Sequence, residues 1–538
     1  MLTLLLLATA PLLSPAEQSA EKLITAESLT AHVRFLASDA LEGRGPGTNG
    51  DRLAQLYLAT QFEALGLKPL GTKGYLQPVE LVGLTGSPDA VTFSTGTKSL
   101  TLKQHDDVVL VSGRQAPTVS LAKAELVFVG YGITAPEYQW DDFKGLDVKG
   151  KVLVVLNNDP EDDPALFAGR TRLYYGRWDY KYEQAQRLGA AGAIIIHTTP
   201  SAGYPWQVVQ TSWAGEQFEL PAPPTGLQVK GWVSSGAAKS LFSLAGVDLD
   251  GAVKAAQRRD FKPIPLGVTV SSTWKVTLAH TSSANVVAML PGSDPVLKDQ
   301  AVVITAHHDH LGRKAGAKAG EDDIFNGAVD NASGCAAMLT LARALSSLPT
   351  APKRSIIFAA VAAEEQGLLG SEYFVAHPPI PPSRMAANLN IDGMNVWGRT
   401  RDVSVIGLGK STIDATLTVL ASAQGRVVHA DAMADRGFFY RSDQFNFAKA
   451  GVPAAYFSSG QDFLGRPPGW GREQREKWEA TTYHQPSDEV HDDWDLKGAI
   501  EDFTLAYELA VSLGNSPSMP TWTKGDEFEA ARLKSLEH

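Results

Sequence analysis

The sequence predicts an α/β fold in which a mixed, mostly parallel sheet is sandwiched by helices, and three observations lead to this prediction. Strand-like apolar runs alternate with helical patterns over residues 283–513. Two of these runs, residues 302–305 and 356–362, are apolar without interruption, which is typical of strands buried on both faces. Three of the runs end in His, Asp or Glu, at the sheet edge where open α/β sheets bind their ligands.

Length and composition narrow the possible functions. A chain of 538 residues allows two to four domains, and its net charge of −11, without Lys/Arg clusters, argues against nucleic acid as a partner. No internal apolar run is long enough to cross a bilayer, so we expect no membrane-spanning segment. The single cysteine, Cys335, excludes an intramolecular disulfide and a cysteine-based zinc cage.

The first 20 residues, MLTLLLLATAPLLSPAEQSA, form an apolar stretch followed by small residues. This pattern resembles the apolar region and cleavage site of a secretory signal, although the usual basic residues in front of it are missing. We therefore predict a signal peptide over residues 1–20 and a secreted or periplasmic protein. An ordinary helix is the alternative.

The next segment, residues 21–118, is expected to be the N-terminal part of the main domain. Residues 25–36 and 52–65 have apolar side chains at helical spacing, and the stretch LEGRGPGTNG between them is predicted to be a loop. Residues 79–111 are strand-like and rich in turns.

A second, β-rich domain is predicted over residues 119–265, inserted into the first. LVFVGYGI, KVLVVL and AGAIIIH have the pattern of strands, and YEQAQRL that of a helix. We expect the polar stretch RRDFKPIP to be the exit linker, and we find no group of catalytic residue types in this domain. The main domain should then continue over residues 266–515, followed by a tail over residues 516–538.

The chemistry is concentrated at strand ends and loops of the main domain. The run VVIT at residues 302–305 leads into His307, and NLNID ends in Asp392. Asp330 precedes a helical pattern, Glu365 follows an apolar strand, and His484 lies in a loop. Two imidazoles and three carboxylates suit zinc with mixed N/O ligands, and two zinc ions require a bridging carboxylate. An additional carboxylate next to a ligand could serve as a base.

The order of these motifs resembles a known family. Over residues 301–490 the chain contains H-x-D, D-N-x-S-G, E-E, D and Y-H-x-x-S-D in sequence, which is similar to the two-zinc exopeptidases of metallopeptidase family 28. YRSDQFNFAKAGVPAAYFSSG, residues 440–460, also resembles that family. The middle domain, with VGYGITAPEYQWDDFKGLDVKGKVLVVL and GAAGAIIIH, resembles the protease-associated (PA) domain often inserted in it.

The resemblance implies two zinc ions per chain and five metal ligands, which are His307, Asp330, Glu365, Asp392 and His484. One zinc would take His307 and Asp392, the other Glu365 and His484, with Asp330 as the bridge. Co²⁺ and Mn²⁺ also suit ligands of this type.

Three further residues receive roles from the same resemblance. Glu364 would be the general base, Asp309 would fix the His307 ring through its second nitrogen, and the Tyr483 hydroxyl would steady the oxyanion. The two remaining imidazoles of the HHDH stretch, His308 and His310, are expected not to bind metal.

The implied function is a secreted zinc aminopeptidase that removes N-terminal residues from peptides. A carboxypeptidase or dipeptidase is the alternative within the same chemistry, and it would need a basic residue such as Arg436 or Arg441 in the pocket. A non-catalytic binding protein on the same fold and a single-zinc cyclase are the remaining alternatives.

Overall fold

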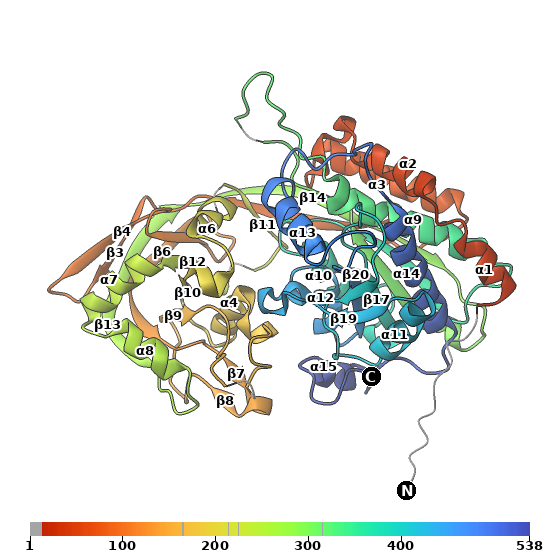
Figure 1. Cartoon of the computed structure of the whole chain (residues 1–538). Coiled ribbons are helices and arrows are strands. Elements are labelled where there is room, and N and C mark those ends of the chain that lie inside the picture. The colour runs from red at the N-terminus through yellow and green to blue at the C-terminus, as the bar shows by residue number, and fades with distance from the viewer. Residues whose placement is uncertain (1–12, 164–165, 214, 224, 315, 538) are drawn as a thin grey trace, which may run out of the picture. The chain divides into compact units, whose positions relative to one another are not determined.

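The computed structural model of the chain describes residues 13–163, 166–213, 215–223, 225–314 and 316–537 (Figure 1). The chain divides into two compact units. Unit 1 comprises the described residues of Met1–Glu80, Ser282–Ala432 and Arg441–His538, and unit 2 those of Leu81–Thr281 and Met433–Tyr440.

Unit 1 is built on a mixed sheet with parallel strands at its centre. The order is β2-β14-β16-β15-β17-β20-β18-β19, in which β16, β15, β17 and β20 are parallel neighbours. β14 and β18 are antiparallel to the strands beside them, β16 and β20. The prediction of a mixed, mostly parallel α/β fold is confirmed. The strand bounds are β1 Lys68–Pro69, β2 Leu76–Thr85, β14 Thr277–Leu290, β15 Ala301–His307, β16 Ser355–Val361, β17 Met385–Asn390, β18 Asp402–Val405, β19 Val427–Ala430 and β20 Ala454–Ser459.

Helices cover both faces of this sheet, because side chains of its central strands are apolar on both sides. Val302 and Ile304 of β15 belong to the core beneath the largest group of helices, whereas Val303 packs on the other face with Phe374 and Phe447. The helices of unit 1 are α1 Pro15–Glu21, α2 Ala26–Leu36, α3 Asn49–Ala64, α9 Ser333–Ser346, α10 Leu369–Ala376, α11 Ile413–Ala423, α12 Gln444–Lys449, α13 Trp470–Thr481, α14 Lys497–Asn515 and α15 Glu529–Leu536.

The two ends of the described chain pack into unit 1. Ser14 caps α1 in a capping box with Glu17, and Ala20 is buried, so α1 overlaps the last residues of the predicted signal peptide. Residues 1–12 of that prediction lie outside the described residues. The predicted C-terminal tail is part of the core, since Trp522 is buried and its Nε1 donates to the Gly451 carbonyl at 3.0 Å.

Unit 2 contains an eight-stranded sheet in the order β4-β3-β13-β6-β9-β10-β12-β5. Its boundaries are wider than the predicted 119–265, because β3 pairs with β13, β4 pairs with β3, and β5 pairs with β12. The predicted exit linker is wrong at its end: Ile264 begins β13 and pairs with Phe128. The bounds are β3 Ala90–Ser94, β4 Ser99–Lys103, β5 Val108–Ser112, β6 Thr118–Phe128, β7 Thr134–Ala135, β8 Trp140–Asp141, β9 Val152–Leu156, β10 Gly192–His197, β11 Gln217–Glu219, β12 Val229–Ser234 and β13 Ile264–Lys275, with helices α4 Trp178–Arg187, α5 Thr199–Ala202, α6 Trp206–Ser212, α7 Ser235–Ala245 and α8 Leu249–Ala256.

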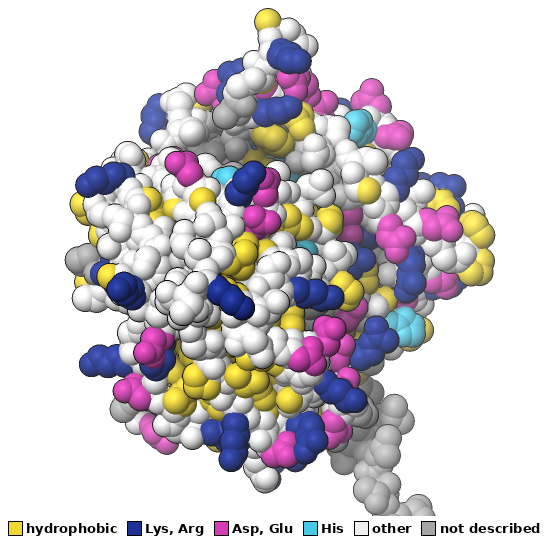
Figure 2. All heavy atoms as spheres, turned by 90° about the vertical axis from the view of Figure 1, so that its left-hand side faces the viewer, with side chains coloured by type: hydrophobic (Ala, Val, Ile, Leu, Met, Phe, Trp, Pro, Cys, Tyr) yellow, Lys and Arg dark blue, Asp and Glu magenta, His cyan; other side chains and the backbone are white. Residues whose placement is uncertain are grey.

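The face of the molecule shown in Figure 2 has both positively and negatively charged side chains. On the face shown in Figure 2, Lys and Arg side chains alternate with Asp and Glu side chains, with apolar side chains between them. Among the described residues, none of the helices combines the length and apolar character that a membrane span requires.

Candidate metal centre

The sheet of unit 1 collects the predicted ligands at one place, because the carboxyl ends of its parallel strands meet at the same edge. The loops after α13 and before α9 close around this edge. The five side chains come from five segments: His307 ends β15, Asp330 precedes α9, Glu365 follows β16, Asp392 follows β17, and His484 follows α13.

Asp330 lies between the two imidazoles. Its Oδ1 is 3.1 Å from Nε2 of His307, and its Oδ2 is 3.2 Å from Nε2 of His484. Each imidazole nitrogen also faces a second carboxylate: His307 Nε2 is 3.4 Å from Asp392 Oδ1, and His484 Nε2 is 3.2 Å from Glu365 Oε2. The geometry therefore divides the donors into two groups that share Asp330.

These donors suit divalent cations. The side chain of His307 is 1% exposed and that of Glu365 4%. Nε2 of His484 is buried without a hydrogen-bond partner among the described residues, although two carboxylate oxygens are directed at it. Neutral imidazole nitrogens and carboxylate oxygens that converge in this way match the ligand preferences of zinc.

The electrostatics show how strongly the site attracts positive charge. Burial alone would lower the pKa of His307, but the neighbouring carboxylates, Glu364 first, hold it well above its ordinary value. The pKa of His484 rises to about 10 for the same reason, through Glu365 and Asp330. Burial opposes ionisation of Glu365, yet the His484 charge lowers its pKa to about 2. Bound metal would replace the protons that the two imidazoles otherwise hold.

The carboxylate of Asp309 was predicted to fix the His307 ring, but its hydrogen-bond partners are backbone N–H groups of the two glutamates. Its carboxylate is 3.8 Å from Nδ1 of His307, whereas its backbone carbonyl is the hydrogen-bond partner of that nitrogen at 3.2 Å. The carboxylate instead accepts the backbone N–H groups of Glu364 (3.0 Å) and Glu365 (3.3 Å). Asp309 therefore fixes the turn that carries the two glutamates, and burial raises its own pKa to about 7.

Glu364 and Tyr483 both lie beside the donors. Oε2 of Glu364 is 3.9 Å from Nε2 of His307, farther than either aspartate oxygen. Burial, and then the charges of Glu365 and Asp392, raise the pKa of Glu364 well above its usual value. The Tyr483 ring stacks on His484 with a centroid distance of 3.9 Å.

Of the two other imidazoles, only His308 is remote from the donors. Nε2 of His308 pairs with the Ala284 carbonyl at 3.0 Å, and Nδ1 is 3.5 Å from Asp51. His310, by contrast, has Nδ1 2.6 Å from Oε1 of Glu365 and groups with Asp330 and Glu365 as a possible cation site. The expectation that His310 does not bind metal is untested, but this side chain is part of the centre.

Two positions to which the sequence assigned no role complete the centre: Arg44, and Asp488 of the Y-H-x-x-S-D motif. Arg44 is buried, and its guanidinium donates to four backbone carbonyls, including those of His308 (2.8 Å) and Gly327 (3.1 Å). The carboxylate of Asp488 accepts the backbone N–H groups of Val329 and Asp330, both at 3.0 Å. The glycine-rich loop around Arg44 and the S-D pair after His484 were the available signals.

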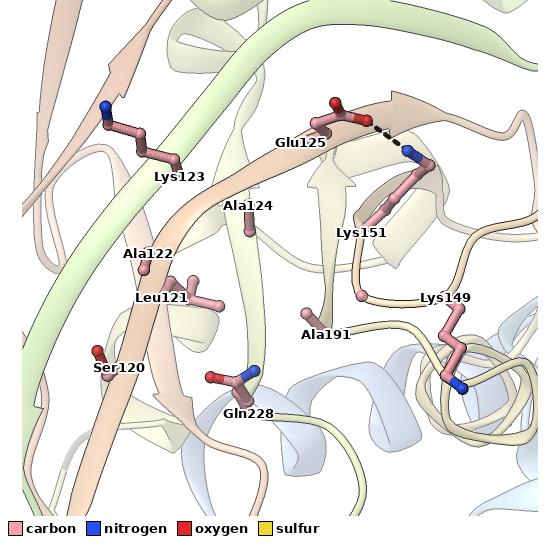
Figure 3. Close-up of a pocket in the computed structure, with 11 residues that line it drawn as sticks. Ser120, Leu121, Ala122, Lys123, Ala124, Glu125, Lys149, Lys151, Ala191 and Gln228 are labelled. Atoms are coloured by element: carbon pink, nitrogen blue, oxygen red, sulfur yellow. Dashed lines mark hydrogen bonds and ion pairs between the residues drawn. The ribbon is translucent and has the colours of Figure 1, made fainter.

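Unit 2 contains a pocket of about 470 Å³ that offers a contrast (Figure 3). One side is formed by residues 120–125 of β6, where Glu125 pairs with Lys151, and Lys149 and Gln228 lie on the other side. The lining residues bring together no cluster of His and carboxylate donors. The pocket therefore does not compete with the centre in unit 1 as a metal site.

Comparison with known proteins gives a family for part of the chain. Residues 285–507 match Peptidase family M28. Leupeptin-inactivating enzyme 1 from Streptomyces exfoliatus is 26% identical over 261 residues, which cover 47% of this chain and 53% of that enzyme. Aminopeptidase YwaD from Bacillus subtilis (strain 168) is 29% identical over 191 residues, covering 35% of this chain and 36% of its own length. The chain thus aligns with about half or less of these relatives.

Two solved structures align over most of the chain at low identity. An aminopeptidase from Aneurinibacillus sp. strain AM-1 has a TM-score of 0.49 and 20% identity, covering 94% of this chain and 97% of that one. A zinc aminopeptidase from Bacillus subtilis has a TM-score of 0.42 and 19% identity, with coverage of 94% and 97%.

Proposed function

We propose that this chain, whose residues 285–507 match Peptidase family M28, is a two-zinc aminopeptidase that removes N-terminal residues from peptides. The observation that carries the proposal is the position of Asp330. One of its oxygens faces His307 and the other faces His484, at 3.1 and 3.2 Å, as a carboxylate that bridges two cations requires.

Each of the two proposed zinc ions would have its own imidazole and carboxylate. His307 and Asp392 would hold one ion, and His484 and Glu365 the other. Zinc at such a site lowers the pKa of an attacking water and polarises the scissile carbonyl. Co²⁺ and Mn²⁺ are proposed as substitutes, because imidazole and carboxylate ligands accept them.

The protein groups around the metal donors would transfer protons, orient the glutamates and stabilise the oxyanion. Glu364 lies at the edge of the cluster, where its carboxylate can take a proton from the attacking water and pass it to the leaving amine. Asp309 would keep Glu364 and Glu365 in their relative orientation through their backbone N–H groups. Burial raises the pKa of Tyr483 well above its ordinary value, so its hydroxyl would stay protonated and could donate to the developing oxyanion.

The proposal is tested by hydrolysis of a panel of aminoacyl-arylamides, each with an N-blocked counterpart, with and without a chelator. We expect cleavage of the free-amine substrates only, lost with the chelator and regained with zinc. Cleavage of neither form by protein with two bound zinc ions would contradict the aminopeptidase assignment. Cleavage of neither form by protein that binds no metal would point to a binding protein, and one tightly bound zinc to the single-zinc cyclase.

A carboxypeptidase or dipeptidase is the second candidate, and one observation favours it. The charge of Arg441 is close enough to Tyr483 to lower the pKa of its hydroxyl against the effect of burial. A guanidinium beside the centre could hold a substrate carboxylate. Cleavage of N-blocked peptides with a free C-terminus would select the carboxypeptidase, and cleavage of unblocked dipeptides alone would select the dipeptidase.

We further propose that the protein is exported and that unit 2 is a PA domain. The apolar N-terminal stretch supports export, and N-terminal sequencing of protein from the extracellular or periplasmic fraction would test it. The motif resemblance of the middle segment supports the PA assignment.

A further inference from the structure

His310 stands out because it is fully buried inside the centre and the proposed reaction does not use it. Its Nδ1 is 2.6 Å from Oε1 of Glu365. The other oxygen of that carboxylate, Oε2, is 3.2 Å from Nε2 of His484. The two oxygens of Glu365 thus have separate partners: Oε1 faces His310, and Oε2 faces the space between His484 and Asp330.

The hydrogen bond fixes which nitrogen of His310 carries the proton. Because an ionised carboxylate only accepts hydrogen bonds, Nδ1 must be the donor. Nε2 has no hydrogen-bond partner among the described residues and is buried. The bond to Glu365 is therefore the one hydrogen bond that the ring makes within the described chain.

The ring has little freedom to turn away from Glu365. The backbone N–H of His310 donates to the Arg44 carbonyl at 3.3 Å. A Cβ atom at Gly327 would lie 2.6 Å from Cδ2 of the ring, so the imidazole packs directly on this glycine. The ring of His484 is on another side, with a centroid distance of 5.6 Å.

We propose that His310 is a positioning residue for the zinc site formed by Glu365 and His484. Its Nδ1–H holds Oε1 and thereby keeps Oε2 directed at the place where the ion would bind. The inference rests on the proposed function, since it assumes that Glu365 is a zinc ligand. Without His310, Glu365 regains side-chain freedom and loses a charge-assisted hydrogen bond, so this site should weaken while the site of His307 and Asp392 does not.

The experiment measures zinc stoichiometry and both zinc affinities by chelator competition in the full-length protein. For His310→Ala we expect one of the two affinities to fall by about 10- to 100-fold, as is usual when a partner of a metal ligand is removed. In His310→Asn the side-chain amide can replace Nδ1–H as donor to Oε1, and we expect this affinity to return to within about threefold of wild type.

His308→Asn is the matched control, because His308 is an equally buried imidazole two residues away with its Nε2 on a backbone carbonyl. It should leave the ratio of the two zinc affinities unchanged. The inference is wrong if His310→Ala binds both ions like wild type, if His310→Asn is as weak as His310→Ala, or if the control changes the ratio equally. Wild-type protein that binds fewer than two zinc ions would instead overturn the proposed function itself, and the inference with it.

Discussion

Replacing Glu364 by glutamine tests the proposed base with little disturbance of the fold. Glutamine has nearly the shape of glutamate, and the backbone N–H at this position would still donate to Asp309 at 3.0 Å. The amide cannot accept a proton from water as a carboxylate does. The substitution should therefore remove the proton transfer and leave the two groups of metal donors in place.

The expected magnitude follows from the place of Glu364 in the centre. Its Oε2 is 3.9 Å from Nε2 of His307, compared with 3.1 Å for Asp330 and 3.4 Å for Asp392, so it is the least suited of the three to share an ion with that imidazole. Loss of a general base lowers kcat by about 10²- to 10⁴-fold. This corresponds to about 3 to 5 kcal/mol of lost transition-state stabilisation.

The assay combines kcat and KM on an aminoacyl-arylamide with the zinc content of wild type and Glu364→Gln. We expect kcat to fall by the stated factor, KM to stay within about threefold, and both zinc ions to remain. Turnover within about tenfold of wild type would refute the role as base. Loss of a zinc ion together with activity would show that Glu364 is a ligand, which its grouping with His307 and Asp392 also allows.

Three further substitutions probe other parts of unit 1. Tyr483→Phe should lower kcat by about 10- to 100-fold with little change in KM if the hydroxyl supports the oxyanion, and an unchanged kcat would dismiss that role. Arg44→Lys should lower the free energy of unfolding, measured with urea, by about 2 to 4 kcal/mol, because an ammonium cannot reach all four carbonyls; a loss below about 0.5 kcal/mol would contradict this. Glu508→Gln tests a pH effect. Burial, and then the Glu21 charge, raise the pKa of Glu508 from 4.5 to about 7, so its ionisation costs stability increasingly from pH 4.5 to 7. At pH 8 the free energy of unfolding of the variant should exceed that of wild type by about 1 kcal/mol after allowance for solvent screening, and its Tm should be higher; near pH 4 the two should be equal. A difference independent of pH would disprove this.

Much of the fold and of the candidate site could be predicted because the signals are local. An apolar run at residues 302–305 defines most of β15, and the same reasoning applies to β16, whereas β17 is interrupted by Asn388 and was located by the NLNID stretch that ends in Asp392. Once these strands are parallel neighbours, the side chains after them must meet, which brings His307, Glu365 and Asp392 together. His484 follows no strand, and only the motif around it indicated its place.

The parts that could not be predicted depend on contacts between distant segments. β3 joins unit 2 by pairing with β13, which lies far along the chain, and β4 follows by pairing with β3. The alternation of apolar residues does not specify β13 as the partner. The stretch HHDH contains three imidazoles within four residues. Which of them faces a glutamate depends on the path of the backbone after β15, and this path is fixed by Arg44 from a loop far away in sequence.

Arg44 also bears on how the acidic centre stays folded. Asp309 is fully buried, the side chains of Glu364 and Glu365 beside it are only 10% and 4% exposed, and the pKa of Glu364 is raised partly by the charge of its neighbour. Arg44 forms its hydrogen bonds with carbonyls and acts on the carboxylates only through its charge, because no carboxylate of the described chain lies within ion-pair distance of it. Such a cluster is destabilising unless further positive charge is bound, either as protons on His307 and His484 or as divalent cations. An ion that binds only the folded state adds its binding free energy to stability. If the proposed centre binds zinc, the stability of unit 1 would therefore depend on the metal.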